Sequence, residues 1–277
     1  MGPFTAFRIH DREDRIEAGL ETLTLDDLSD GEVVIRGEWS SINYKDALAA
    51  TGAGKILRRY PLIGGVDIAG TVAESADPRL TEGQRVVVCG CGLSETRDGG
   101  FTQVARVPAE SVTPLPNGLD TRTAMQLGTA GLTAALAVHR MEHNGQSPQL
   151  GPVVVTGSTG GVGSIAVNIL SARGYEVAAM TSKPDADDYL RALGAAQILN
   201  LREMELGQRP LERATWGGAV DNLGGEPLAW LTRTVRPNGN IASIGLAAGT
   251  ALNTTVMPFI LRGVNLLGIN SVDVDRE

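Results

Sequence analysis

The feature that most constrains the fold is a glycine-rich turn, which lies between an apolar run and a helix-like segment in "VVVTGSTGGVGSIAVNIL", residues 153–170. Gly160 and Gly161 allow the backbone to approach a ligand closely, and Gly163 allows the helix to pack near the strand. A helix that begins here would direct free N–H groups at an anion. The stretch therefore predicts a strand, a phosphate-binding turn and a helix. Its spacing departs from the strict G-x-G-x-x-G pattern, so a turn without a ligand is the alternative.

The chain after this turn alternates between strand-like and helix-like segments. The strand-like segments occupy 152–157, 176–182, 197–200, 218–224, 240–245 and 264–270. The helix-like segments occupy 163–172, 186–193 and 226–235. Strands that alternate with helices are joined by right-handed crossovers and form a parallel sheet with helices on its faces. The second half of the chain is therefore predicted to be a doubly wound α/β domain.

The first half follows a different pattern, in which short β-rich pieces are separated by Gly, Pro, Asp and Asn. These pieces occupy 32–43, 67–75 and 84–92. A Pro- and Gly-rich stretch at 112–120 precedes a helix-like segment at 121–141. With 277 residues, the chain has the length of about two domains. We therefore place a β-rich domain at 1–120 and a nucleotide-binding domain at 121–270.

Composition excludes several classes of partner and location. The formal net charge is −8, and no dense stripe of Lys and Arg offsets it, so we expect no nucleic-acid partner. No apolar stretch reaches the ~20 residues that span a bilayer, and the N-terminus lacks the layout of a signal peptide. We therefore expect a soluble cytoplasmic protein with no membrane association. Cys89 and Cys91 alternate along a strand-like run, so we expect no disulfide between them.

The strand after the glycine-rich turn indicates which dinucleotide is bound. In NAD-binding proteins an Asp or Glu follows this strand and binds the ribose 2′-hydroxyl. Here Thr181, Ser182 and Lys183 follow, and no carboxylate occurs before Asp185. Two hydroxyls and an ammonium group can bind a 2′-phosphate by charge-assisted hydrogen bonds. We therefore predict NADP(H) as the cofactor, with an ordinary solvated Thr-Ser-Lys loop as the alternative.

Several motifs resemble a known family. "SSINYKDALAATGAGKI", "GGVDIAGTV", "LGTAGLTAAL", "VTGSTGGVGS" and "TTVMPFILRGVNLLGINSV" are similar to the acrylyl-CoA reductase branch of the medium-chain dehydrogenase/reductase superfamily, a group of quinone-oxidoreductase-like NADPH enzymes. The resemblance implies a GroES-like β-rich catalytic domain joined to a Rossmann domain. It also implies a zinc-free, NADPH-dependent reduction of the C=C bond of a short α,β-unsaturated acyl-CoA, such as acryloyl-CoA.

The resemblance further implies nucleotide contacts at matching positions of this chain. Tyr44 would lie beside the nicotinamide, and Thr129 would reach the nicotinamide amide, unless Thr129 only allows close helix packing. The pyrophosphate contacts would be Thr159, Gly160, Gly161 and Val162, and the 2′-phosphate contacts would be Thr181, Ser182 and Lys183. Further contacts, at or after the ends of later strands, would be Asn222, Gly245, Leu246 and Asn270.

The implied reduction needs a group that stabilises negative charge on the thioester oxygen. Tyr44 combines a neutral hydroxyl, an aromatic face and an expected loop position after a strand, so it is the first candidate. Asn43 and Asp46 would orient Tyr44 or the substrate. Two alternatives stay open: Tyr44 is a packing residue, or it only shapes the nicotinamide pocket while water supplies the proton.

A substrate that carries coenzyme A brings phosphates. Lys55, Arg58 and Arg59 form the most local basic cluster of the chain and follow Tyr44 closely. The planar guanidinium of Arg binds phosphate through two parallel hydrogen bonds. We therefore treat these side chains as a candidate CoA contact, with a solvated loop as the default interpretation.

No metal site is expected. A catalytic zinc needs about three Cys, His or carboxylate ligands. His10, His139 and His143 are scattered along the chain. His139 and His143 have the spacing to share a helix face, but no convincing third ligand accompanies them.

The family resemblance also bears on the end of the chain. After the sixth Rossmann strand, such chains return to the first domain, and residues 271–277 would begin that return. Either the rest of that return is missing from the protein, or it is not included in the given sequence. If it is missing, we expect an incompletely closed first domain, and nucleotide binding that survives better than turnover. Family analogy suggests a homodimer, for which the edge strand at 264–270 is a candidate pairing surface.

Three functions are compatible with the sequence. The first is reduction of acryloyl-CoA or a related enoyl-CoA, and the second is zinc-free reduction of quinones or small enones. The third is a non-catalytic role as an NADPH-binding protein. Comparison of a CoA thioester with its free enone separates the first two, and the third would bind NADPH without oxidising it.

Overall fold

The computed structural model describes residues 1–13 and 15–272. The chain forms two compact units. The first contains Met1–Thr129 and takes up the chain again from Ser271, whereas the second contains Ala130–Asn270.

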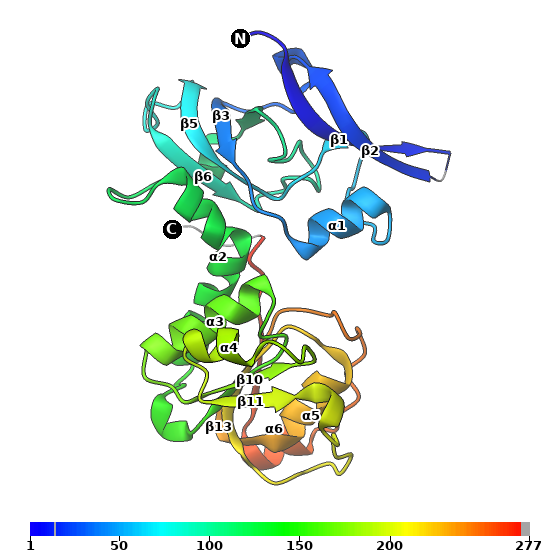
Figure 1. Cartoon of the computed structure of the whole chain (residues 1–277), viewed down its shortest axis with the longest axis vertical. Coiled ribbons are helices and arrows are strands. Elements are labelled where there is room, and N and C mark those ends of the chain that lie inside the picture. Colours follow the sequence, from blue (N-terminus) through cyan, green and yellow to red (C-terminus); the bar gives the residue numbers. More distant parts are fainter. Residues whose placement is uncertain (14, 273–277) are drawn as a thin grey trace. The chain divides into compact units, whose positions relative to one another are not determined.

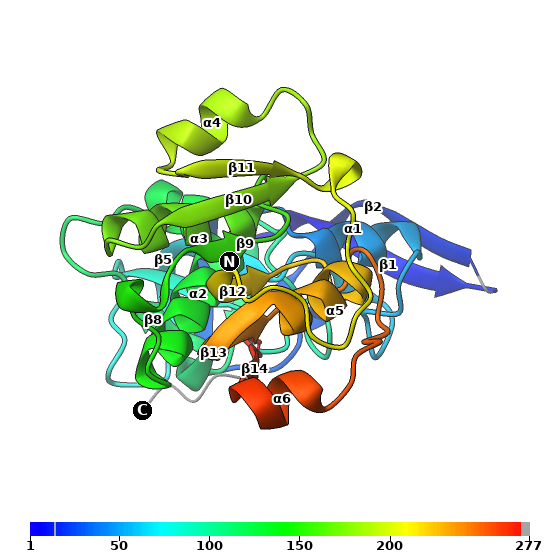
Figure 2. The same cartoon turned by 90° about the horizontal axis from the view of Figure 1, so that it is seen from below.

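The second unit is built on a six-stranded parallel sheet with the strand order β11-β10-β9-β12-β13-β14. The strands can be followed in this order in Figure 2. Their bounds are β9 (Val153–Val155), β10 (Val177–Thr181), β11 (Gln197–Asn200), β12 (Trp216–Asp221), β13 (Val235–Ser243) and β14 (Asn265–Gly268). The chain runs outward from β9 to β11 and then continues from β12 on the other side. The sheet is therefore doubly wound, which confirms the prediction.

Helices cover both faces of this sheet. They are α3 (Gly161–Ala172), α4 (Asp187–Ala192), α5 (Gly225–Thr234) and α6 (Met257–Arg262). Val153 and Val155 are buried in one cluster with residues of α3, whereas Val154 is buried in another cluster with residues of α5. Side chains alternate between the faces of a strand, so a strand that is covered on both faces needs a continuous apolar run. This requirement explains why β9 reads Val-Val-Val.

The first unit contains two antiparallel sheets, with the orders β7-β3-β5-β6-β8 and β2-β1-β4. The strand bounds are β1 (Phe4–Arg12), β2 (Arg15–Leu23), β3 (Val33–Trp39), β4 (Leu62–Ile63), β5 (Asp67–Ser75), β6 (Arg85–Cys89), β7 (Val104–Val107) and β8 (Thr113–Pro114). Short 3-10 helices occur in both units: η1 (Leu25–Asp27), η2 (Ala109–Ser111), η3 (Pro148–Leu150) and η4 (Leu201–Glu203). The predicted β-rich character of the first half is confirmed.

The long hairpin of β1 and β2, which Figure 1 shows, was not predicted. Its strands pair along their whole length, from Phe4 and Leu23 to Arg12 and Arg15. Leu23 is the one buried residue of β2. The alternation of buried and exposed side chains that reveals a strand in a sequence is therefore weak here.

Two helices belong to or begin in the first unit, α1 (Tyr44–Thr51) and α2 (Thr121–His143). Helix α2 begins at the predicted domain boundary. The division between the two compact units falls inside this helix, after Thr129. Gly128, with φ 50° and ψ −154°, interrupts the helical backbone just before this point. The segment predicted as one helix is therefore two helical segments.

Candidate functional site

The glycine-rich turn lies between β9 and α3, as predicted. Gly157 has a φ of +59°, in the left-handed region that glycine adopts without strain. A Cβ atom at Gly163 would lie 2.3 Å from the carbonyl oxygen of Gly157, so only glycine allows α3 to pack this closely. Helix α3 begins at Gly161, and the N–H groups of its first turn have no carbonyl partners within the helix. These groups can bind an anion.

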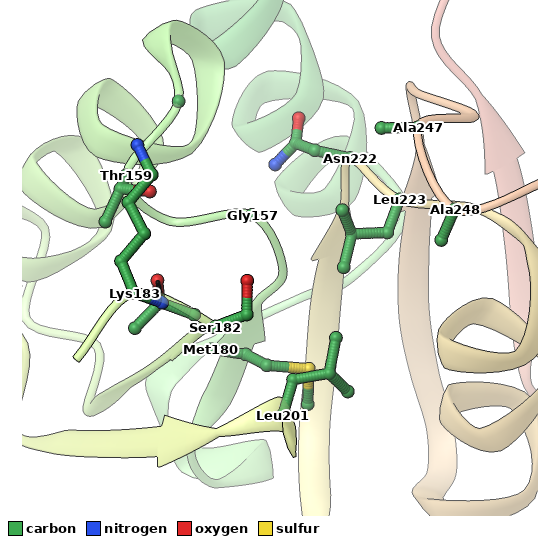
Figure 3. Close-up of a pocket in the computed structure, with 12 residues that line it drawn as sticks. Gly157, Thr159, Met180, Ser182, Lys183, Leu201, Asn222, Leu223, Ala247 and Ala248 are labelled. Carbon is green, nitrogen blue, oxygen red and sulfur yellow. Dashed lines mark hydrogen bonds between the residues drawn. The ribbon is translucent and has the colours of Figure 1, made fainter.

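A cavity of about 450 Å³ lies beside this turn, at the carboxyl ends of the strands (Figure 3). The strand order reverses between β9 and β12, and doubly wound sheets bind their ligands at that point. The residues that line the cavity include neither Asp nor Glu. They are Gly157, Thr159, Gly160, Met180, Thr181, Ser182, Lys183, Leu201, Asn222, Leu223, Ala247 and Ala248.

Half of the lining residues were singled out from the sequence as nucleotide contacts. These are Thr159, Gly160, Thr181, Ser182, Lys183 and Asn222. Figure 3 shows Asn222 and Ala247 across the cavity from Thr159 and Lys183. Met180, Leu201 and Leu223, which the sequence analysis did not single out, add apolar surface to the wall.

The remaining predicted nucleotide contacts lie outside this lining. Gly161 and Val162 form the first turn of α3. Gly245 and Leu246 precede Ala247 in the loop after β13, and a Cβ atom at Gly245 would lie 2.2 Å from the carbonyl oxygen of Asn222. Asn270 follows β14 and is exposed.

The predicted 2′-phosphate contacts form a turn at the end of β10. Thr181 is 6% exposed, and its Oγ1 accepts a hydrogen bond from the backbone N of Lys183 at 3.1 Å. Ser182 and Lys183 are exposed, and their side chains have no hydrogen-bond partner among the described residues. Figure 3 shows the Lys183 side chain extending toward Thr159. Its ammonium group is therefore available to a ligand at this wall of the cavity.

The hydrogen bonds of Asn222 indicate that the cavity fits a polar ligand. Its Nδ2 donates to the carbonyl oxygen of Thr156 at 2.7 Å, and its backbone N donates to Thr156 Oγ1 at 2.8 Å. Its Oδ1 is buried and has no hydrogen-bond partner among the described residues. A buried acceptor without a partner costs free energy, which a donor on a bound ligand would recover. The residues present therefore fit a nucleotide, which carries hydroxyl groups as well as phosphates.

The first unit contains a buried carboxylate that the sequence analysis did not single out. Asp67 is 0% exposed and accepts hydrogen bonds from Ser41 Oγ and, at 2.8 Å, from Asn43 Nδ2. Thr129 donates to it twice, through N at 3.0 Å and Oγ1 at 2.5 Å. A buried charge is tolerated when hydrogen bonds compensate its lost hydration. The available signal was one acidic residue within the apolar run "GGVDIAGTV".

Gly128 makes the contact between Thr129 and Asp67 possible. Its non-helical backbone interrupts α2, and the N–H of Thr129 donates to Asp67. A Cβ atom at Gly128 would lie 2.8 Å from Ser41 Oγ and 2.9 Å from Asp67 Oδ2, so no larger residue fits. For Thr129 a nicotinamide contact or close helix packing was expected, and its hydrogen bonds to Asp67 were not predicted.

Tyr44 is the first residue of α1, which corrects the predicted loop position. The helix begins there because Asn43 and Asp46 cap it: Asp46 Oδ2 accepts a hydrogen bond from the backbone N of Asn43 at 2.7 Å. Tyr44 is 66% exposed, and its hydroxyl has no hydrogen-bond partner among the described residues. The phenol is therefore a free donor.

Asp46 is buried, and its hydrogen bonds connect α1 to the segment before β5. Its Oδ1 accepts a hydrogen bond from the backbone N of Val66 at 3.1 Å. Burial raises the pKa of Asp46, the charge of Asp67 raises it further, and the hydrogen bonds from Asn43 and Val66 oppose this rise. Both carboxylate oxygens bind backbone amides, so Asp46 positions the start of α1 rather than the Tyr44 hydroxyl itself.

The three side chains of the basic cluster, Lys55, Arg58 and Arg59, differ in their contacts. Arg59 donates to Ser29 Oγ at 2.7 Å and to the carbonyl oxygen of Thr96 at 2.9 Å. The exposed side chains of Lys55 and Arg58 have no hydrogen bond or ion pair with any described residue. Lys55 and Arg58 are therefore free to meet an anion.

Neither a metal cluster nor a membrane span is found in the described part of the chain. No group of three or more His, Cys, Asp and Glu side chains there could hold a metal ion. His139 and His143 do lie together, with ring centroids 6.3 Å apart. Among the described residues, no helix is both long and apolar enough to cross a bilayer.

Two family models match the chain. The alcohol dehydrogenase GroES-like domain matches residues 29–117, and the zinc-binding dehydrogenase domain matches residues 161–277. The two matches fall in the β-rich half and in the nucleotide-binding half, respectively.

Curated relatives cover nearly the whole chain. The acrylyl-CoA reductase AcuI of Ruegeria pomeroyi is 49% identical over 93% of this chain and 78% of its own length. The putative quinone oxidoreductase YhfP of Bacillus subtilis is 46% identical over 97% of this chain and 82% of its own length.

Solved structures agree with these relatives. The NADPH-bound structure of YhdH from Escherichia coli has a TM-score of 0.95 at 45% identity, over 98% of this chain and 84% of that one. The NAD-bound structure of YhfP from Bacillus subtilis also has a TM-score of 0.95 at 45% identity, over 99% of this chain and 84% of that one. The chain therefore belongs to the medium-chain dehydrogenase/reductase superfamily, in the branch of the acrylyl-CoA reductases and quinone-oxidoreductase-like proteins.

Proposed function

We propose that this protein is an NADPH-dependent reductase of the C=C bond of a short α,β-unsaturated acyl-CoA such as acryloyl-CoA. One observation carries the proposal: the wall of the nucleotide cavity presents Thr181, Ser182 and Lys183 and includes no carboxylate. A carboxylate at this wall would favour the ribose 2′-hydroxyl of NAD and repel a 2′-phosphate. The close relationship to an acrylyl-CoA reductase supports the choice of substrate.

A second candidate function is reduction of quinones or small enones. The Bacillus subtilis relative is named as a putative quinone oxidoreductase, and its structure was solved with NAD bound, which supports this candidate. A third candidate is a non-catalytic role as an NADPH-binding protein.

In the second unit, the residues of the cavity would hold the nucleotide. Thr159, Gly160, Gly161 and Val162 would lie along the pyrophosphate, where the free N–H groups of α3 favour negative charge. Ser182 and Lys183 would bind the 2′-phosphate, and Asn222 would accept a hydrogen bond. Gly245, Leu246 and Asn270 stay proposed contacts. The nicotinamide cofactor, when bound, supplies hydride to the β-carbon of the substrate.

In the first unit, the hydroxyl of Tyr44 would donate a hydrogen bond to the thioester oxygen, where negative charge develops during reduction. A donor at such a position lowers the barrier by a few kcal/mol, typically about 3 kcal/mol. Asn43 and Asp46 would position Tyr44 through the start of α1, and Asp67 would hold Asn43 and Thr129 in place. Lys55 and Arg58 would contact the phosphates of coenzyme A.

The decisive experiment follows the oxidation of NADPH by its absorbance with acryloyl-CoA, a small enone and a quinone, with NADH in parallel. We expect turnover with NADPH and the thioester, little with NADH, and a smaller kcat/KM for the free enone. Faster reduction of the enone or quinone would favour the second candidate. Binding of NADPH without oxidation by any acceptor would favour the third.

We also propose that the protein is cytoplasmic and forms a homodimer through the edge strand β14. β14 is the last strand of the sheet, and β13 is its only partner strand in the described part of the chain. Leu266 on β14 is 37% exposed, and Ile260 and Leu261 on neighbouring α6 are 72% and 61% exposed. An unpaired edge beside exposed apolar side chains is suited to pairing with a second copy.

A further inference from the structure

Asp221 is a buried carboxylate that directly precedes Asn222, a residue of the cavity lining. It is the last residue of β12 and is 0% exposed. Its side chain accepts hydrogen bonds from Thr156 Oγ1 at 2.8 Å, from Gly224 N at 2.8 Å and from Leu223 N at 3.4 Å. Burial raises the pKa of Asp221, and these hydrogen bonds lower it. Burial of a carboxylate costs free energy, so a functional role for Asp221 is worth testing.

The hydroxyl of Thr156 connects Asp221 to Asn222. An ionised carboxylate can only accept hydrogen bonds, so the single hydrogen of the Thr156 hydroxyl is directed at Asp221. The hydroxyl oxygen then accepts from the backbone N of Asn222 at 2.8 Å. The direction of each hydrogen bond in this chain is therefore determined.

The same contacts determine how the Asn222 amide is turned. Its Nδ2 donates to the backbone carbonyl oxygen of Thr156 at 2.7 Å. A carbonyl oxygen cannot bind the amide oxygen, so the amide cannot flip, and Oδ1 stays the end without a partner among the described residues. Asn222 thus presents a buried acceptor at a residue that lines the cavity.

Asp221 also stabilises the turn that carries the far wall of the cavity. It binds the N–H of Gly224, whose φ is +67° and where a Cβ atom would lie 2.4 Å from the carbonyl oxygen of Gly249. Ala248 N donates to the carbonyl oxygen of Leu223 at 2.8 Å, which joins this turn to the loop after β13. Both Leu223 and Ala248 line the cavity.

We propose that Asp221 and Thr156 are positioning residues of the nucleotide site. They hold Asn222 so that its Oδ1 accepts a hydrogen bond from an uncharged O–H or N–H donor of the nucleotide, such as a ribose hydroxyl. This inference rests on the proposed nucleotide-binding function. An amide oxygen suits this place because it accepts a hydrogen bond without bringing negative charge near the phosphates.

The test compares two substitutions of one buried residue. Thr156→Val keeps the shape of the side chain but removes the hydroxyl, whereas Thr156→Ser keeps the hydroxyl but removes a methyl group. We expect Thr156→Val to raise the Kd for NADPH about 3- to 10-fold, as for the loss of one neutral hydrogen bond, and Thr156→Ser to change it less than about twofold. Fluorescence of the bound nicotinamide gives the Kd. A larger effect of Ser than of Val would indicate a packing role and overturn the proposal.

A double-mutant cycle tests whether Thr156 acts through Asn222. Asn222→Ala should weaken NADPH binding by a similar factor, and Thr156→Val should add little in the Asn222→Ala background. Fully additive effects would contradict the proposal. Asp221→Asn should likewise weaken binding in the native background and much less beside Asn222→Ala.

Thr232→Val is the matched control. Thr232 is buried in α5 of the same unit, and its hydroxyl donates to the carbonyl oxygen of Ala229 at 2.7 Å, outside the cavity lining. It should bind NADPH with unchanged Kd, and a loss equal to that of Thr156→Val would overturn the proposal. The ligand-free Tm of each variant reports folding separately. Because these assays contain no acceptor, they are unaffected if the proposed substrate is wrong.

Discussion

At the scale of single residues, we expect the choice between NADPH and NADH to depend on Lys183. Its side chain lines the cavity, and its ammonium group has no hydrogen-bond or ion-pair partner among the described residues. A phosphate of the ligand would therefore be its only charged partner there. We expect Lys183→Ala to raise the KM for NADPH about 10- to 100-fold, as for the loss of a charge-assisted hydrogen bond. The KM for NADH, which has no 2′-phosphate, should stay unchanged.

Steady-state kinetics with both nucleotides measure this difference. Arg191→Ala is a suitable control, since Arg191 is an exposed cation on α4 outside the cavity lining. An equal loss with NADPH and NADH would mean that Lys183 does not recognise the 2′-phosphate.

Lys55 and Arg58 carry a second prediction, about the substrate. The double substitution Lys55→Gln and Arg58→Gln should raise the KM for acryloyl-CoA about 5- to 20-fold, if two exposed phosphate contacts are lost, and leave the KM for a small enone unchanged. Arg85→Gln, which removes another exposed cation of the same unit, is the control. Equal effects on thioester and enone would exclude a role in binding coenzyme A.

At the scale of elements, we expect the thermal stability of the protein to depend on the interruption of α2 at Gly128. Gly128→Ala places a side chain in a glycine-only backbone conformation, which costs about 1–3 kcal/mol, and presses it against Ser41 and Asp67. We expect a lower Tm and a reduced kcat, because the contacts of Thr129 and Asn43 to Asp67 would be disturbed.

Gly118→Ala separates the two causes. Gly118 also has a positive φ, of 92°, but an added Cβ would meet nothing within 4 Å. It should lower the Tm by backbone strain alone and leave kcat intact. If both variants lower the Tm equally and neither changes kcat, the Asp67 cluster is structural only.

Tyr175 lies shortly before β10 and contacts Glu142 of α2. This contact predicts how the stability of the unit depends on pH. Burial, followed by the negative charge of Glu142, raises the pKa of Tyr175 to about 12. The single hydrogen of its hydroxyl is shared between Glu142 Oε1 at 3.3 Å and the carbonyl oxygen of Gln146 at 3.2 Å. Because the folded pKa lies above the unfolded value of about 10, the stabilising contribution of the neutral phenol is complete below pH ~10 and is lost as the pH rises toward ~12.

Spectrophotometric titration of the tyrosines checks this value. One component should ionise near pH ~12, above the ordinary tyrosine range of about 10, and should be missing in Tyr175→Phe. A titration curve that the substitution leaves unchanged would contradict the assignment.

At the scale of the whole molecule, the proposed homodimer depends on the edge of one sheet. Leu266→Lys places a charge on exposed β14 and should convert a dimer to a monomer in analytical ultracentrifugation, because charged edge residues oppose strand pairing. Leu20→Lys is the control, since Leu20 is 75% exposed on the β1–β2 hairpin of the other unit. A wild-type protein that sediments as a monomer would exclude the dimer.

Much of this architecture could be read from the chain itself. The strands of the second unit are apolar runs between helix-like segments, and the glycines at 157, 160, 161 and 163 meet local requirements of a turn. Thr181, Ser182 and Lys183 follow directly from the end of one strand. These features depend on neighbours in sequence, so periodicity and turn chemistry reveal them.

What the tertiary structure decided is which distant polar groups meet. Asp67 binds Asn43 and Thr129, which lie 24 and 62 positions away in the chain. Asp221 binds Thr156 across 65 positions, because parallel pairing brings the ends of β9 and β12 together. A lone acidic residue in an apolar run looks the same in sequence whether it is partnered or not. Its partners are set by strand register and helix position, and these follow from the packing of the whole unit rather than from any local pattern.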